Sequence, residues 1–171
     1  ISCSGFHLLA QANVGINTTT PLAGLHVKDK DVLFSFEGNH VLLGPLPPVS
    51  GAGTRMMWYA SKGAFRAGKV DGAHWNRDSV GFFSTAFGIN TIAAGIGSFA
   101  TGQNTEARGL GSMSVGIGTL AKMDGSLTIG SYNDTAAGVL FFQNGVAIID
   151  PVFMVGNGTA DNARSNAFSV F

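Results

Sequence analysis

Small and larger side chains alternate along residues 79–133, and the alternation repeats with a step of fourteen residues. A serine, a small residue and a glycine recur at positions i, i+2 and i+4 of each copy, which places them on one face of a β-strand. No 3.6-residue period occurs, so the pattern predicts strands and not helices. The three columns of small residues are Ser84, Ser98, Ser112 and Ser126; Ala86, Ala100, Ser114 and Thr128; and Gly88, Gly102, Gly116 and Gly130.

Each copy is long enough for two short strands and two tight turns. A further column of alanines follows a turn in each copy, at Ala93, Ala107 and Ala121. We interpret a copy as one coil of an all-β parallel solenoid, in which successive coils stack about 4.8 Å apart. The small-residue face lets the two walls of a coil approach closely, and glycines supply the positive φ angles of tight turns. One coil cannot bury its own core, so the coils have to stack.

The opposite face of the predicted strands is apolar. The candidates for an interface between chains are Phe99, Met113, Val115, Leu127 and Ile129. A thin solenoid cannot cover this face by itself, and partner subunits are the simplest cover. We therefore predict that the chain associates with copies of itself and has no stable folded monomer.

Four further segments flank the repeats. Residues 1–12 end in Ala10-Gln11-Ala12, a pattern typical of a signal-peptide cleavage site, so we expect the remnant of an export signal there; an ordinary apolar strand is the alternative. Residues 13–53 alternate short apolar runs with Gly, Asn, Thr and Pro, which predicts short strands joined by turns. Residues 54–78 hold both tryptophans and are expected to cap the solenoid, and residues 134–171 are expected to form a C-terminal β segment.

The segment 54–78 combines aromatic and basic side chains. Its candidates for ligand contact are Trp58, Arg66, Lys69, Trp75 and Arg77. Aromatic rings beside cations can stack on sugars or bind anions. Rings of this size also cap the exposed end of a stacked repeat, and we favour the cap as their main role. Near the C-terminus, Asp161 and Arg164 are expected to tie a turn.

Composition excludes several classes of function. The net charge is zero and charged residues make up 12% of the chain, so no basic field for nucleic acid exists. The single cysteine allows no internal disulfide, and the four histidines are too scattered to predict a metal site. Residues 63–69 match a G-x-x-x-x-G-K pattern, but Val70 stands where a phosphate-binding loop needs Ser or Thr. We predict no catalytic residue, no cofactor, no metal and no membrane-spanning helix.

The units SFATG, SMSVG and SLTIG resemble the YadA-like head of trimeric autotransporter adhesins, and the resemblance covers residues 79–133. It implies a left-handed parallel β-roll, three chains per head, and an apolar face turned toward the three-fold axis. The stretch VGINTTTPLAGLHV is similar to a short β-motif of such proteins and of phage tail fibres. Phe83, Phe87 and Met123 depart from the repeat pattern, so we expect their coils to be capping or transitional.

These observations predict a non-enzymatic homotrimer on the bacterial cell surface or secreted from the cell. It would present a multivalent surface to a host, matrix or glycan ligand, or act as a rigid spacer, with the outer-membrane anchor in a part outside this chain. The alternative is a phage-type or secreted fibre that uses the same roll as a structural shaft.

Overall fold

The computed structural model describes residues 13–40, 45–135, 138–142, 145–149 and 151–171. The export signal expected at residues 1–12 lies outside the described residues. The chain is all-β, as predicted: its described elements are strands and three single-turn 3-10 helices. It divides into two units, residues 1–35 and residues 36–171.

The described part of the first unit contains one pair of short strands. β1 (Val14–Ile16) and β2 (Leu25–Val27) pair in parallel, with Val14 opposite Leu25. The loop between them exposes Leu22 almost completely. The short strands expected within residues 13–53 are therefore present at these two places.

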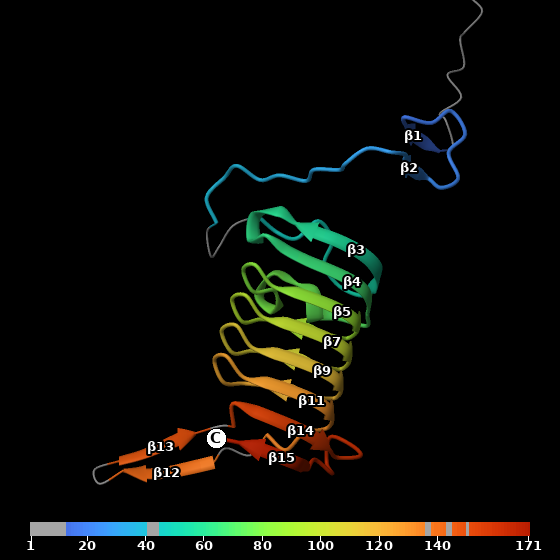
Figure 1. The fold of residues 1–171 in the computed structure, drawn as a ribbon. Helices are drawn as coiled ribbons and strands as arrows, with labels where there is room; N and C mark the ends of the chain where they lie inside the picture. The colour runs from blue at the N-terminus through green and yellow to red at the C-terminus, as the bar shows by residue number, and fades with distance from the viewer. Residues whose placement is uncertain (1–12, 41–44, 136–137, 143–144, 150) are drawn as a thin grey trace, which may run out of the picture. The chain divides into compact units, whose positions relative to one another are not determined.

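An eight-stranded sheet dominates the second unit (Figure 1). Its strands, in spatial order, are β3 (Gly53–Tyr59), β4 (Ala64–Val70), β5 (Thr85–Ile89), β7 (Phe99–Gln103), β9 (Met113–Ile117), β11 (Leu127–Ser131), β14 (Phe153–Asn157) and β15 (Asn166–Val170). From β4 to β14 every neighbouring pair is parallel, whereas β3 and β15 are antiparallel and form the two edges. We call this the large sheet.

A second, shorter sheet alternates with the large sheet along the chain. Its strands are β6 (Ile92–Ala93), β8 (Glu106–Ala107) and β10 (Leu120–Ala121), paired in parallel. In both sheets the paired residues of the repeats are fourteen positions apart, as Phe99 and Met113 are. The period read from the sequence is thus the register between the repeat strands of both ladders. The first three repeat units contribute one strand to each sheet, and the fourth contributes β11 to the large sheet.

The space between the two sheets is filled by the small-residue columns. Ala86 and Ala100 of the large sheet cluster with Ala93 and Ala107 of the short sheet, and all four are fully buried. The serines of the first column are also buried, and the hydroxyl of each donates to the carbonyl three residues earlier, as Ser98 does to Gly95 at 2.7 Å. The prediction that small residues face inward is confirmed.

Glycine at the end of each repeat strand is required by close backbone approach. Gly102 has φ of +124°, and a Cβ built on it would lie 1.9 Å from the carbonyl oxygen of Gly116. Any side chain would therefore push neighbouring strands apart.

Residues 54–79 cover the space between the two sheets at the end next to the first repeat unit. Arg66 pairs with Ala86 in the ladder and is fully buried; its guanidinium donates to the Ser84 carbonyl at 2.8 Å and to the Ala93 carbonyl at 3.0 Å. Burial lowers the pKa of Arg66 to about 10. The 3-10 helices of this segment are η1 (Ala60–Lys62), η2 (Ala73–Trp75) and η3 (Arg77–Ser79).

Trp75 and Lys62 complete this cover. Trp75 is fully buried and its indole N–H donates to the Thr91 carbonyl at 2.9 Å. The Lys62 ammonium donates to the carbonyls of Arg77 and Val80, both at 2.6 Å, and desolvation by burial lowers its pKa. The polar atoms of these side chains thus bind backbone carbonyls of the first repeat unit and its neighbours.

An antiparallel hairpin lies along the chain between β11 and β14, which pair directly with each other in the large sheet. It consists of β12 (Gly138–Phe142) and β13 (Gly145–Ile149). Within the described ranges, no helix has the length and apolarity needed to cross a membrane.

Candidate binding surfaces

Two surfaces of the second unit could bind a partner. The first is the face of the large sheet that points away from the short sheet, which we call the outer face. Residues that pair directly across strands share a face, so the register defines its columns. One column is Trp58, Phe65, Thr85, Phe99, Met113, Leu127, Phe153 and Val170. The other is Met56, Ala67, Phe87, Thr101, Val115, Ile129, Val155 and Phe168.

Aromatic rings on the outer face contact each other across strands. Phe65 and Phe87 lie 5.7 Å apart between ring centroids, and Phe87 and Phe99 lie 6.0 Å apart, both edge to face. At the other end, Phe153 contacts Phe168 at 6.0 Å. Such pairs stabilise the face beyond their area of burial, yet much of the apolar surface stays in water: Met56 is 76% exposed and Phe168 is 55% exposed.

All five predicted interface residues lie on the outer face. Phe99, Val115, Leu127 and Ile129 are half-buried and Met113 is 41% exposed. The sequence interpretation missed the flanking members of the face, such as Met56, Phe65 and Phe168. A strand alternation of period two was readable in residues 53–59 and 166–170, but these strands carry no serine and glycine columns to mark them as parts of the same sheet.

The five predicted ligand contacts do not form one surface. Trp58 lies on the outer face, 37% exposed. Lys69 is half-exposed and its ammonium lies 2.9 Å from Asp71, while Arg77 lies 3.3 Å from Asp78. Arg66 and Trp75 are fully buried, so neither presents a side chain to a ligand at the surface of this chain.

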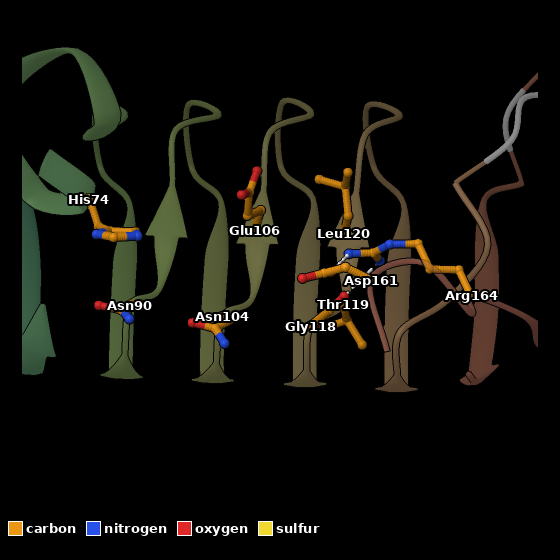
Figure 2. Close-up of a pocket in the computed structure, with 9 residues that line it drawn as sticks. All are labelled: His74, Asn90, Asn104, Glu106, Gly118, Thr119, Leu120, Asp161 and Arg164. Atoms are coloured by element: carbon orange, nitrogen blue, oxygen red, sulfur yellow. Dashed lines mark hydrogen bonds and ion pairs between the residues drawn. The ribbon is translucent and has the colours of Figure 1, made fainter. Parts of the chain in front are cut away.

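The second surface is a polar groove with a cavity volume of about 200 Å³. It crosses the turns that join the two sheets, and Figure 2 shows its lining residues arrayed over successive repeat units, from His74 at one end to Arg164 at the other. We call it the turn groove. Its lining residues are His74, Asn90, Asn104, Glu106, Gly118, Thr119, Leu120, Asp161 and Arg164.

Left-handed turns build the floor of the turn groove. Asn90, Asn104 and Gly118 occupy equivalent positions in consecutive repeat units, with φ of 52°, 52° and 61°. Asn and Gly tolerate this conformation better than other residues. The N–H of Asn104 donates to Ile89 of the previous unit and that of Gly118 donates to Gln103, both at 2.8 Å. The turns are therefore held in a ladder of their own.

Arg164 closes one end of the turn groove. Its guanidinium donates to the Gly118 carbonyl at 2.8 Å, to the Asn133 carbonyl at 3.2 Å and to Asp161 Oδ1 at 2.5 Å. Its central carbon also lies 5.8 Å from the ring centroid of Tyr132. The expectation that Asp161 and Arg164 tie a turn is confirmed, although their reach to Gly118 was not foreseen.

Comparisons of the chain with protein-family models, with curated proteins and with solved structures found no match. Among the described residues, no group of three or more His, Cys, Asp or Glu side chains could hold a metal ion.

Proposed function

We propose that this chain is the head of a non-enzymatic, surface-exposed homotrimer of the adhesin type, built as a left-handed parallel β-roll. Three outer faces would meet around a common axis and cover one another. The remaining surface of each protomer would then be presented in three equal copies, so that weak contacts with a host, matrix or glycan ligand add up through avidity.

The composition of the outer face carries this proposal. The two columns named above run across all eight strands of the large sheet without a charged residue, and Lys69 lies on the same face in the next column, opposite Ile89. Contiguous exposed apolar patches of this kind mark interaction sites on soluble proteins. Direct pairing continues both columns from β3 to β15, so the face presents one continuous apolar strip to a second copy of the chain.

The trimer is tested by light scattering coupled to size exclusion. We expect the purified chain to elute with three times the chain mass of 17.6 kDa. Val115→Asp and Ile129→Asp each place a charge in the centre of the face, where burial without a partner costs several kcal/mol. Each variant should lose the trimer.

Ile96→Asp is the matched control. Ile96 is 48% exposed in a turn, and the equivalent position two repeat units later is already an aspartate, Asp124. This variant should keep the trimer. A monomeric wild type, or trimers in both face variants, would contradict the proposed assembly. Binding of the wild-type trimer to host cells or matrix proteins then separates an adhesive head from a fibre shaft, which would not bind.

A further inference from the structure

The turn groove has unused hydrogen-bonding groups. The Asn104 side chain is exposed and makes no hydrogen bond within the described part of the chain. The equivalent Asn90 is occupied, because its carboxamide accepts from the Asp71 N–H at 2.8 Å and donates to the Asp71 carboxylate at 3.0 Å. Glu106 uses only Oε2, which accepts from Arg108 at 2.6 Å, and His74 Nδ1 has no partner among the described residues.

The charges of the turn groove are balanced. Glu106 is paired with Arg108, and Asp161 is paired with Arg164 at 2.5 Å. An anionic ligand would meet two carboxylates, and a cationic ligand would have to compete with two guanidinium groups already in place. The groove therefore suits a neutral ligand that can both donate and accept hydrogen bonds.

The volume of the turn groove and the spacing of its turns restrict the class of ligand further. A volume of about 200 Å³ is room for about six or seven water molecules, which a single sugar ring can displace. Consecutive turns follow at a step of about 4.8 Å, so further rings of the same chain could continue over neighbouring repeat units. Because a carboxamide beside a carboxylate can accept from and donate to adjacent hydroxyl groups, Asn104 and Glu106 fit a sugar diol.

We propose that the turn groove binds one ring of a neutral oligosaccharide, with Asn104 and Glu106 as its hydrogen-bonding residues. The biological role of this sugar site, contact with a glycan outside the cell, depends on the proposed adhesive function. The groove lies within one protomer, however, so binding of the sugar does not need the trimer.

The test is titration calorimetry of the wild-type protein with neutral disaccharides, namely lactose, maltose, cellobiose and diacetylchitobiose. We expect saturable binding of at least one of them with a Kd in the millimolar range. Asn104→Gly removes the carboxamide and keeps the left-handed turn, as Gly118 does in the same column. Asn104→Gly and Glu106→Gln should each weaken binding about tenfold.

Gln103→Ala is the matched control, because it removes the neighbouring carboxamide, which lies at the end of β7 beside Ile89 and Ile117 and outside the groove. Its affinity should equal that of the wild type. The inference is overturned if no neutral disaccharide binds, if both groove variants bind unchanged, or if a sulfated disaccharide binds more tightly than its neutral counterpart. Light scattering on the same samples keeps the two proposals apart: a trimer without sugar binding contradicts only the sugar site, and a sugar-binding monomer contradicts only the assembly.

Discussion

A column of buried threonines offers a comparison inside one molecule. Thr91, Thr105 and Thr119 occupy equivalent positions, and all are fully buried. Thr119 Oγ1 lies 2.8 Å from the hydroxyl of Ser114, five residues earlier. At the other two positions the residue five places earlier is Ala86 or Ala100, and the threonine hydroxyl has no partner among the described residues.

Replacing each threonine by valine should therefore give opposite results. Thr105→Val removes a hydroxyl that is desolvated without compensation and should stabilise the protein by about 1 kcal/mol. Thr119→Val leaves the buried Ser114 hydroxyl without its partner and should destabilise it by about 1–2 kcal/mol. The side-chain shape changes equally in both, so packing alone predicts no difference.

Thermal unfolding at matched protein concentration measures the effect, because association makes the melting temperature depend on concentration. For a chain of this size each kcal/mol corresponds to about 2–4 °C, so the two variants should separate by about 4–12 °C. Ser114→Ala combined with Thr119→Val removes both partners and should recover part of the loss. Equal destabilisation by Thr105→Val and Thr119→Val would refute the reasoning, since it would mean that the Thr105 hydroxyl is bonded.

Two further pairs of variants test the packing. Gly102→Ala should cost several kcal/mol in unfolding experiments, because its Cβ would meet the Gly116 carbonyl at 1.9 Å, whereas Gly111→Ala, with φ of +63° and open space around it, should cost about 1 kcal/mol; equal losses would contradict the close-approach argument. Trp75→Ala should lower the melting temperature through the loss of about 3–5 kcal/mol of core packing. Trp58→Ala should chiefly weaken the trimer seen by light scattering. If Trp75→Ala instead weakened the trimer and Trp58→Ala lowered the melting temperature, the two rings would have been given the wrong roles.

The periodic part of the molecule could be predicted from the sequence because its constraint is repeated. Every unit needs a small residue between the sheets and a glycine where strands approach. A small residue equivalent to Ala100 and a glycine equivalent to Gly102 therefore occur in each repeat unit. The inward direction of the small face follows from the same constraint. The outer-face positions of Val115 and Ile129 then follow from the alternation of side chains along a strand.

The flanking strands could not be predicted because their spacing is irregular. Phe65 pairs with Thr85 across twenty positions, and Leu127 pairs with Phe153 across twenty-six. Without that register, Arg66 could not be placed opposite Ala86 in the interior, and a charged side chain was naturally expected at the surface. The turn groove was missed for a similar reason: Arg164 reaches Gly118 over forty-six residues, through a loop that has no counterpart in the repeats.

The antiparallel strands β3 and β15 form the two edges of a sheet in which the steps from β5 to β11 are equivalent. The number of strands in the large sheet is consequently set by the repeat units, whereas its two edges are set by other stretches of the chain. Deleting or duplicating fourteen residues, such as 99–112, would shorten or extend the protomer by about 4.8 Å while leaving both ends and every remaining contact pattern in place. Evolution can thus change the length of such a domain in increments of one repeat unit, without changing the edge strands β3 and β15.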